Sequence, residues 1–363
     1  MRRVRPSERQ PGVSQPFAAT ARPELLDALG RAPFDVLVIG GGITGTGVAR
    51  DAALRGLRVA LVERDDFASG TSSRSSRLVH GGVRYLEHGE FHLVFESSRE
   101  RRILLRIAPH LVRPLPFVWP VYERARIPAW KLQAGLFLYD LLSLFRNVGR
   151  AQRLTPSALA ALEPKVRRDG LVGGARYYDA ATDDARLTIA NAQGAAAAGG
   201  VMLNHVEAHE LIVEQGTVRG AVVRDRPTGR CITVRAAAVI NAAGPWSDTI
   251  RRLAVPATES GVRGTKGVHV SVPRARVGNH EALTLLSPVD GRVMFVLPAG
   301  EAFSIIGTTD TDYRGALDLV RATADDVDYL LRSANAFFPD ARLEGSDVVS
   351  AWAGVRPLVS SMQ

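Results

Sequence analysis

The chain has 363 residues, 46% of them hydrophobic and 23% charged, which is typical of a globular protein of about two domains. Its net charge of +9 comes almost entirely from arginines spread along the chain, so the charge does not indicate a nucleic-acid surface. The single cysteine, Cys231, excludes an intramolecular disulfide and fits a reducing compartment, so we expect a cytoplasmic location.

Residues 1–33 are expected to form a flexible N-terminal tail. They contain arginines and scattered prolines, and only one short helical turn is expected, at residues 24–29. The Arg2–Arg3 pair is followed by no apolar run, so it does not indicate a secretory signal.

The next segment predicts a dinucleotide-binding unit. Residues 36–39 are apolar and indicate a buried parallel strand, and Gly40, Gly42 and Gly45 follow with the G-x-G-x-x-G spacing that opens a helix. The first glycine allows a tight turn, the second lets backbone N–H groups approach a pyrophosphate, and the third lets the helix pack on the strand. The phosphate charge is then expected at the positive N-terminus of the helix.

A second short apolar run supports this interpretation. Residues 59–62 form the expected second strand and lead to Glu63, which lies 18 residues after Gly45. A carboxylate at that point binds the ribose 2′-hydroxyl of an adenosine and repels a 2′-phosphate. The residues themselves therefore predict FAD or NAD.

A hydroxyl-rich loop at residues 68–77 comes next, followed by helical periodicity over residues 90–108 and a proline-rich extended segment at 114–122. Residues 134–145 are strongly apolar but too short to span a bilayer. Two interpretations of this segment stay open: a helix in a membrane interface, and a helix buried in the core.

The second half of the chain predicts more sheet. An alanine-rich helix over residues 188–198 precedes a strand at 201–203, and three alternating segments then indicate a meander. A buried strand at residues 238–241 returns to the first sheet, so the dinucleotide domain is discontinuous in sequence. Later strands, expected near residues 267–272, 292–298 and 303–310, form a second layer.

Two pairs of residues, one of histidines and one of carboxylates, have spacings that could suit a metal. His88 and His92 are four residues apart on a possible helix, but no third ligand accompanies them. Asp310 and Asp312 are explained more simply by a turn after a strand. No metal site is therefore predicted.

At this point the chain resembles one family, the FAD-dependent, quinone-linked glycerol-3-phosphate dehydrogenases of the glycine-oxidase-like flavoprotein group. The resemblance runs in order from about residue 35 to residue 358. It rests on the glycine turn, on Thr71-Ser-Ser-Arg-Ser-Ser and His80-Gly-Gly-Val-Arg-Tyr-Leu-Glu, and on Asp183-Asp-Ala-Arg-Leu. Three later motifs complete it: Asn241-Ala-Ala-Gly-Pro-Trp, Phe303-Ser-Ile-Ile-Gly-Thr-Thr-Asp and Gly354-Val-Arg-Pro-Leu.

The resemblance implies an α/β fold, with a Rossmann-like FAD-binding domain built on a βαβ unit and a second, mixed or antiparallel β-sheet domain for the substrate. The expected parts are residues 34–110 and 183–255 for FAD, 111–182 as a connecting, substrate-side segment that is a candidate for membrane association, and 256–350 for the substrate. Residues 351–363 are expected to begin the last FAD-domain segment. The family chain continues further, with a Gly-Gly-Lys segment and a helical C-terminal domain.

The resemblance also implies which residues hold FAD. They are Gly40, Gly42, Ile43, Thr44, Gly45, Glu63, Arg64, Thr71, Ser72, Ser73, Ser76, Leu78, Gly81, Gly82, Val206, Ala243 and Gly244. Val206 is expected to approach the adenine through its backbone.

Substrate contacts are expected from Arg84, Tyr85, His269, Thr309 and Arg356. Guanidinium groups suit a phosphate, and a histidine suits proton exchange with a hydroxyl near neutral pH. Arg84, His269 and Arg356 are thus the candidate catalytic residues, with His269 the candidate base.

The function implied is oxidation of sn-glycerol 3-phosphate to dihydroxyacetone phosphate, by hydride transfer to flavin and then electron transfer to a membrane quinone. The expected partners are therefore a small phosphorylated polyol, a quinone and the inner face of the cytoplasmic membrane, and a homo-oligomer is compatible with the sequence. Two alternatives stay open: a flavoenzyme that oxidises an amino acid or a 2-hydroxy acid, and an inactive truncated FAD-binding fragment.

Overall fold

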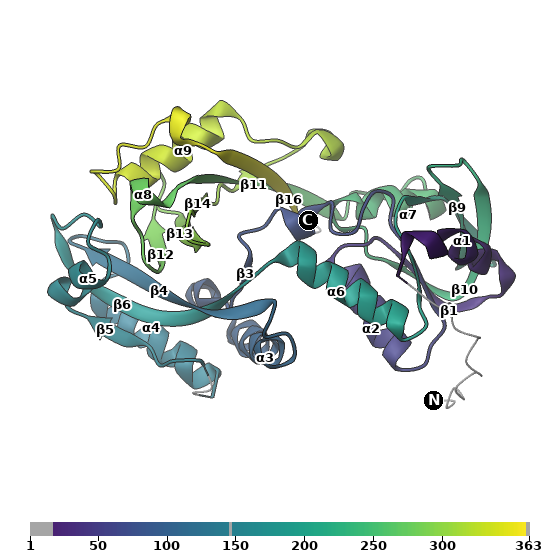
Figure 1. Ribbon diagram of the computed structural model, residues 1–363, viewed down its shortest axis with the longest axis horizontal. Coiled ribbons are helices and arrows are strands. Elements are labelled where there is room, and N and C mark those ends of the chain that lie inside the picture. The colour runs from purple at the N-terminus through teal and green to yellow at the C-terminus, as the bar shows by residue number, and fades with distance from the viewer. Residues whose placement is uncertain (1–16, 145–146, 361–363) are drawn as a thin grey trace.

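The computed structural model describes residues 17–144 and 147–360, apart from the side chains of Arg84, Glu87 and His88. It forms two lobes, each built around one β-sheet (Figure 1). The α/β fold, with a Rossmann-like lobe and a second sheet, confirms the fold class predicted from the sequence.

The smaller lobe contains the dinucleotide unit. Among the described residues its sheet has the strand order β7-β2-β1-β10-β9-β8. The strands β7, β2, β1 and β10 run parallel, whereas β10, β9 and β8 form an antiparallel meander. The strands are β1 (Phe34–Ile39), β2 (Val59–Val62), β7 (Val201–Leu203), β8 (Val206–Glu214), β9 (Thr217–Asp225) and β10 (Cys231–Asn241).

Helices cover both faces of this sheet, as they must when parallel strands are buried on both sides. Helices α2 (Ile43–Leu54) and α6 (Asp184–Ala197) lie side by side on one face (Figure 1). Helices α1 (Arg22–Arg31) and α7 (Ser247–Ala254) cover the other face. Strand β1 has neighbours from distant parts of the sequence, so the lobe is discontinuous, as the sequence predicted.

Strand β10 is a single strand, whereas the sequence predicted two strands, at residues 232–234 and 238–241. Its first half, Cys231–Arg235, pairs with β9, and its second half pairs with β1 from Ala236 onwards. The same backbone therefore joins the meander to the parallel sheet. The alternating residues 232–234 and the apolar residues 238–241 were expected in separate strands, but they belong to the same strand.

Residues 22–31 are more ordered than the sequence suggested, whereas residues 1–16 of the expected tail lie outside the described residues. Helix α1 has ten residues, where the sequence predicted a flexible tail with one helical turn. Its side chains Leu25, Leu26 and Leu29 are buried against β10 and β7, and Arg22 pairs with the buried carboxylate of Asp225. Burial of three leucines stabilises a short helix that would be marginal in isolation.

The larger lobe is built on a mixed sheet with the strand order β15-β11-β14-β13-β12-β4-β6-β3 among the described residues, and β16 and β5 are attached to its path. Its helices include α3 (Phe91–Ile107), α4 (Ala129–Leu142) and α9 (Ala324–Asn335). The strands are β3 (Leu78–Val79), β4 (Val112–Tyr122), β5 (Gln152–Leu154), β6 (Leu171–Thr182), β11 (Val262–Pro273), β12 (Ala282–Leu286), β13 (Val293–Ala299), β14 (Phe303–Gly307), β15 (Thr311–Asp312) and β16 (Ser350–Val359).

Two of the expected segment boundaries differ from the structure. Strand β3 pairs with β6 and α3 packs on β4 and α4, so the first part of the cofactor lobe ends near residue 77 instead of residue 110. Strand β16 was expected to begin the last cofactor-domain segment, but it pairs with β11 along the whole stretch from Ser350 to Val359. A continuous antiparallel ladder satisfies its backbone groups there, which places it in the larger sheet.

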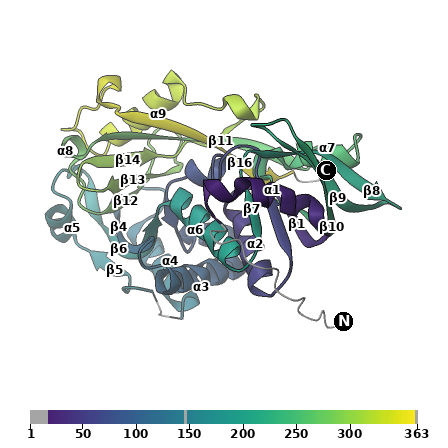
Figure 2. The ribbon, with the colours of Figure 1, turned by 45° about the vertical axis from the view of Figure 1, so that its right-hand side comes forward.

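The turned view shows β16 and β11 passing between the two lobes (Figure 2). Two hydrogen bonds attach the hydroxyl-rich loop, residues 68–77, to this junction. The Thr71 hydroxyl donates to the carbonyl of Val355 at 2.7 Å, and the indole N–H of Trp352 donates to the carbonyl of Ser75 at 3.3 Å. The junction therefore places residues 71–76 beside both sheets.

Candidate active site between the two sheets

A cavity of about 380 Å³ lies at the carboxyl ends of β1, β2 and β10. Open α/β sheets bind their ligands at the carboxyl ends of the strands, at the point where the strand order reverses. Many of the residues expected to hold the cofactor line this cavity: Gly40, Gly42, Ile43, Thr44, Glu63, Arg64, Thr71, Ser72, Val206, Ala243 and Gly244.

The glycine turn fits its sequence interpretation residue by residue. Gly40 has φ +114°, and a Cβ there would stand 2.5 Å from the carbonyl oxygen of Ala242 at the end of β10. A Cβ at Gly45 would stand 1.9 Å from the carbonyl oxygen of Gly40, so α2 packs directly against the end of β1. Gly45 does not line the cavity, and its role is the close packing of helix and strand.

The N-terminus of α2 meets the hydroxyl-rich loop. The backbone N–H of Ile43 donates to Oγ of Ser72 at 2.9 Å, and a Cβ at Gly42 would stand 3.1 Å from the same oxygen. First-turn N–H groups and the helix dipole favour an anion at this point. Residues 42–44 and 71–72 thus form the wall of the cavity that suits a pyrophosphate.

Glu63 is held at the rim by two backbone donors. Its Oε2 accepts from the N–H of Gly41 at 2.6 Å and its Oε1 accepts from the N–H of Asp65 at 2.8 Å. These bonds fix the carboxylate at the end of β2, and each oxygen keeps a further lone pair for a hydroxyl. The contact of Glu63 with a ribose stays a prediction.

Several lining residues were missed by the sequence interpretation. Trp246 lines the cavity, and its indole N–H donates to Asp318 at 3.1 Å, while Arg64 binds the same carboxylate at 2.5 Å and lies over the indole ring. Trp246 ends the quoted Asn241-Ala-Ala-Gly-Pro-Trp motif, which was the available signal. Thr249, Ile250 and Leu253 of α7 also line the cavity, and no local pattern distinguishes them from core residues.

Besides Gly45, five of the expected cofactor residues do not line this cavity: Ser73, Ser76, Leu78, Gly81 and Gly82. Gly81 has its N–H bound to Asp179 at 2.8 Å, and a Cβ there would stand 2.1 Å from the hydroxyl of Tyr139. Its backbone donor is thus used inside the protein. The other four follow the loop towards the larger sheet, and their cofactor contacts stay predictions.

His269 lies on β11 in the larger sheet and is only 2% exposed. Its Nε2 is 2.8 Å from Oγ of Ser76, and its ring stacks on Trp352 with an interplanar angle of 9°. Gly307 faces it on β14, where a Cβ would stand 2.2 Å from the ring. Among the described residues Nδ1 has no hydrogen-bond partner.

The environment keeps this imidazole neutral. Burial, together with the positive charges of Arg356 and Arg77, lowers the pKa of His269 to about 3. A neutral imidazole retains a lone pair that can accept a proton at physiological pH. A pKa of about 3 nevertheless makes it a weak base in the ligand-free chain, so the role of His269 as the base stays a prediction.

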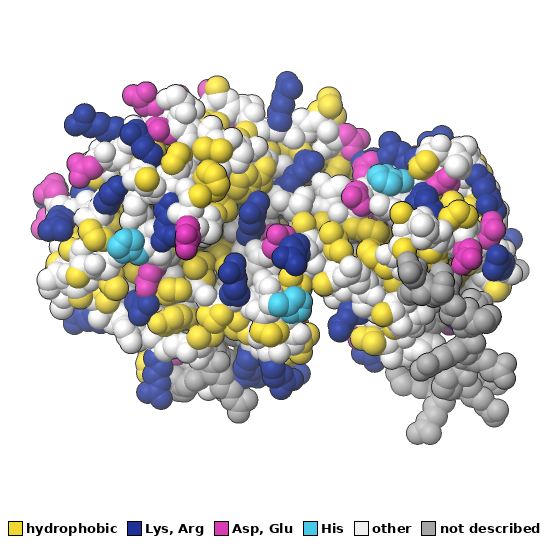
Figure 3. Space-filling view, viewed as in Figure 1, with side chains coloured by type: hydrophobic (Ala, Val, Ile, Leu, Met, Phe, Trp, Pro, Cys, Tyr) yellow, Lys and Arg dark blue, Asp and Glu magenta, His cyan; other side chains and the backbone are white. Residues whose placement is uncertain are grey.

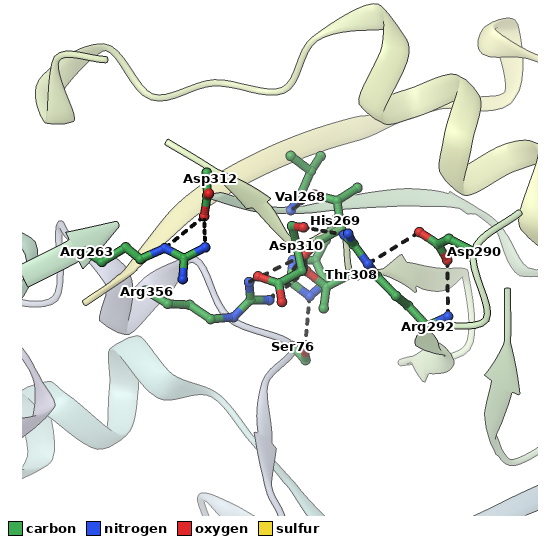
Figure 4. A network of polar contacts seen from close by, with 11 residues as sticks. Ser76, Arg263, Val268, His269, Asp290, Arg292, Thr308, Asp310, Asp312 and Arg356 are labelled. Atoms are coloured by element: carbon green, nitrogen blue, oxygen red, sulfur yellow. Dashed lines mark hydrogen bonds and ion pairs between the residues drawn. The ribbon is translucent and has the colours of Figure 1, made fainter. Parts of the chain in front are cut away.

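Arg356 lies on β16 and points towards the same region (Figure 4). It donates to Oγ1 of Thr308 at 3.0 Å and pairs with Asp310 at 3.1 Å. In the ladder between β11 and β16, Arg356 lies opposite residue 265, and residue 352 lies opposite His269. Residues 265 and 269 are four apart on β11 and share a face, so Arg356 and His269 lie on the same face of the sheet. Arg292 binds the carbonyl of Asp310 and thereby fixes the loop that holds Arg356.

The other expected substrate residues differ in their placement. Thr309 is buried, and its hydroxyl accepts from the N–H of Val268 at 3.0 Å, so it supports β11. Tyr85 packs against Gly82 and its ring lies 6.2 Å from that of His80. The side chain of Arg84 lies outside the described residues.

The residue next to Arg356, Pro357, lines the cofactor cavity. Strand β16 therefore joins the cavity to the His269 region, and Ser76 extends the cavity loop to the imidazole itself. In the space-filling view, hydrophobic side chains line the middle of the molecule where the lobes meet, with Lys and Arg side chains among them (Figure 3). The arrangement suits a dinucleotide beside a small anionic substrate.

Comparisons with known proteins agree with this arrangement. The family described as FAD-dependent oxidoreductase matches residues 35–363. Glycerol-3-phosphate dehydrogenase 2 of Mycobacterium tuberculosis strain H37Rv is 45% identical over 336 residues, which are 92% of this chain and 56% of the relative. Alpha-glycerophosphate oxidase of Streptococcus pneumoniae is 42% identical over 332 residues, which are 90% of this chain and 54% of the relative.

Solved structures give the same result. The glycerol-3-phosphate dehydrogenase of Bacillus halodurans, in complex with FAD, superimposes with a TM-score of 0.80 at 38% identity, over 95% of this chain and 61% of that chain. A glycine oxidase of Bacillus cereus shares the fold, with a TM-score of 0.67 at 22% identity, over 90% of this chain and 83% of that chain. The chain spans little more than half the length of the curated relatives it matches.

Proposed function

The chain belongs to the family of FAD-dependent oxidoreductases, and from this premise we propose that it oxidises sn-glycerol 3-phosphate to dihydroxyacetone phosphate. The observation that carries the proposal is the placement of a neutral, buried His269 and of Arg356 on one face of β11 and β16. An alcohol that carries a phosphate needs both a base and a fixed cation.

The residues of the cavity fit FAD. The bare glycines of the turn, the first N–H groups of α2 and the carboxylate of Glu63 form a cradle for a pyrophosphate and a ribose. Val206 and α7 close the far end of the cavity, where an adenine would lie. FAD, when bound, supplies the acceptor for the hydride that leaves the substrate carbon.

Two residues of the chain would then have separate roles. Arg356 presents a planar guanidinium, already oriented by Thr308 and Asp310, to the substrate phosphate. His269 takes the proton of the C2 hydroxyl while the hydride departs. Burial of the imidazole between Trp352 and Gly307 favours its neutral form before the substrate binds.

The test is a reduction experiment without oxygen. The 363-residue chain is reconstituted with FAD, and the flavin absorbance is followed after addition of sn-glycerol 3-phosphate. Rapid bleaching by this substrate, and none by glycerol, is the expected result. A chain that binds FAD but is not bleached would overturn the proposed activity.

Flavoenzymes that oxidise amino acids or 2-hydroxy acids are the second candidate class, because they also need an arginine, there for a carboxylate. The fold shared with a glycine oxidase favours keeping this alternative. The same bleaching assay with glycine, proline and lactate separates the two. Bleaching by one of these in place of glycerol 3-phosphate would assign the second class.

We further propose that a quinone accepts the electrons and that the protein meets this quinone at a membrane surface. Within the part of the chain that the structure describes, no helix is long and apolar enough to cross a membrane. Helix α4 covers residues 134–142 of the apolar segment, and Phe145 lies outside the described residues. Leu132, Leu136 and Tyr139 are buried in the core, whereas Trp130 and Phe137 are exposed. Exposed aromatic side chains on a half-buried helix suit an interfacial contact.

A further inference from the structure

Ser76 and His269 come from different lobes and meet at the junction. Ser76 ends the hydroxyl-rich loop, and His269 lies in the middle of β11. Their side chains are 2.8 Å apart, from Oγ to Nε2 (Figure 4). The neighbouring Ser75 turns the other way and bonds to Asp184 at the start of α6. The loop therefore presents the Ser76 hydroxyl to the imidazole from a fixed backbone.

The imidazole is otherwise held by packing alone. Trp352 stacks on one face of the ring, and the bare backbone of Gly307 lies beside its edge. Its Nδ1 has no hydrogen-bond partner among the described residues. Ser76 is thus the polar contact that can set which nitrogen carries the proton, as hydrogen bonds set histidine tautomers in general.

The direction of the bond depends on the tautomer of the ring. Among the described residues, Nε2 is the one hydrogen-bond partner of the Ser76 hydroxyl, which is able to donate to it. A serine O–H that donates to Nε2 leaves the lone pair on Nε2 and the proton on Nδ1. The basic nitrogen then faces the loop whose residues Thr71 and Ser72 line the cofactor cavity.

We propose that Ser76 is the positioning residue of His269: its hydroxyl holds the imidazole as the Nδ1–H tautomer, with the basic Nε2 directed at the cofactor side. The catalytic meaning of this assignment rests on the proposed function, since a substrate hydroxyl that takes the place of Ser76 at Nε2 meets the lone pair. The tautomer itself is a property of the chain without cofactor or substrate.

Charged groups around the ring favour its neutral state. Arg356 approaches from β16 and Arg77 from the end of the same loop, where its guanidinium lies 5.3 Å from the centre of the Trp352 ring. Asp310 lies nearby but is paired with Arg356. Burial and both cations lower the pKa of His269 to about 3, so the ring is neutral at pH 7, and the contact with Ser76 is what can distinguish its two tautomers.

The experiment is nitrogen NMR on the ligand-free chain, labelled with ¹⁵N-histidine. His269 is assigned by loss of its signals in His269→Asn, and the two-bond couplings of the ring identify the tautomer. The variants are Ser76→Ala, Ser76→Thr and, as a matched control, Ser271→Ala. Ser271 lies two residues further on β11, and its hydroxyl bonds to Ser350 instead of the imidazole.

We expect the native chain and Ser76→Thr to show a protonated Nδ1 and an unprotonated, hydrogen-bonded Nε2 at pH 7. Ser76→Ala should move both nitrogens towards the averaged shifts of a mixed tautomer, and Ser271→Ala should leave them unchanged. An Nε2–H tautomer in the native chain, an unchanged pattern in Ser76→Ala, or the same change in Ser271→Ala would each overturn the proposal. Because no flavin or turnover is involved, a failed bleaching assay cannot produce any of these outcomes.

Discussion

The guanidinium of Arg356 lies against the bare backbone of Gly267 on the neighbouring strand. A Cβ at residue 267 would stand 2.5 Å from Nη2 of Arg356 and 2.8 Å from Oγ1 of Thr308. Gly267 lies two residues before His269 on the same face of β11. The missing side chain thus makes the space in which the cation and the imidazole become neighbours.

Replacing this glycine should affect binding more than folding. In Gly267→Ala the new methyl group displaces the flexible end of Arg356, while the strand itself keeps its pairing. We expect KM for glycerol 3-phosphate to rise about tenfold, which corresponds to about 1.4 kcal/mol, with a smaller change in kcat. The control is Gly264→Ala, because that Cβ would stand 3.0 Å from Val355 and would not touch Arg356. Equal effects of the two alanines would contradict this role of Gly267.

Arg356→Lys should weaken phosphate binding although the charge is retained. Lysine lacks the fork that reaches Thr308 and Asp310 together, so it would present a mobile point charge. A lost charge-assisted hydrogen bond costs about 1.5–3 kcal/mol, so KM should rise by roughly tenfold to a hundredfold. Competition by inorganic phosphate should weaken in parallel. If KM rose while the inhibition constant of phosphate stayed the same, Arg356 would not be the phosphate ligand.

His269 should make the fold sensitive to acid. Its pKa in the folded chain, about 3, lies below the value of about 6.5 in an unfolded chain, so the unfolded state binds more protons between these limits. Stability is therefore fully present above about pH 6.5 and falls as the pH is lowered, by roughly 2 kcal/mol between pH 7 and pH 5 from this residue alone.

Urea unfolding of the native chain and of His269→Gln at pH 7 and pH 5 measures this contribution. The difference in unfolding free energy between the two pH values should be about 2 kcal/mol smaller in the variant. His92→Gln, a change at an exposed histidine on α3, serves as the control. An identical pH dependence of all three chains would show that His269 is not a buried neutral group.

Local patterns in the sequence predicted more of the cofactor site than of the substrate site. Gly40, Gly42 and Glu63 stand in one βαβ unit, where spacing alone fixes their relative positions. The contact between Ser76 and His269 joins residues 193 apart, and no spacing rule predicts it. Strand β16 was misplaced for the same reason, because only its long ladder with β11 shows which sheet it joins.

The N-terminal helix illustrates a different limit. Residues 22–31 contain good helix formers after a proline, but ten residues are too few for a stable isolated helix, so the sequence predicted only one turn. The burial of Leu25, Leu26 and Leu29 decides the structure, and burial depends on β7 and β10, which lie about two hundred residues further on. Tertiary contacts of this kind cannot be predicted from the local sequence.

The buried pair of Arg101 and Asp179 should be important for stability. Both side chains are at most 5% exposed, and Asp179 also accepts from the hydroxyl of Tyr139 and the N–H of Gly81. Asp179→Asn leaves the Arg101 charge without compensation, so we expect a loss of about 3–5 kcal/mol in urea unfolding. Asp51→Asn, which breaks an exposed pair with Arg55, should cost far less. Similar losses in both variants would contradict the importance of burial.

The exposed aromatic side chains of α4 should bind lipid. Trp130 is 73% exposed and Phe137 is 63% exposed, on a helix whose other side is fixed in the core. An interface that covers both side chains gains about 1.5–3 kcal/mol for each, so the double variant Trp130→Ser, Phe137→Ser should bind vesicles at least tenfold less well. Co-sedimentation with vesicles of phosphatidylethanolamine and phosphatidylglycerol, in high salt, measures this.

Leu319→Ser removes an equally exposed side chain, also 73%, from a different surface and should leave binding unchanged. If the native chain stayed in the supernatant, or if Leu319→Ser reduced binding as much as the double variant, α4 would not be the lipid contact.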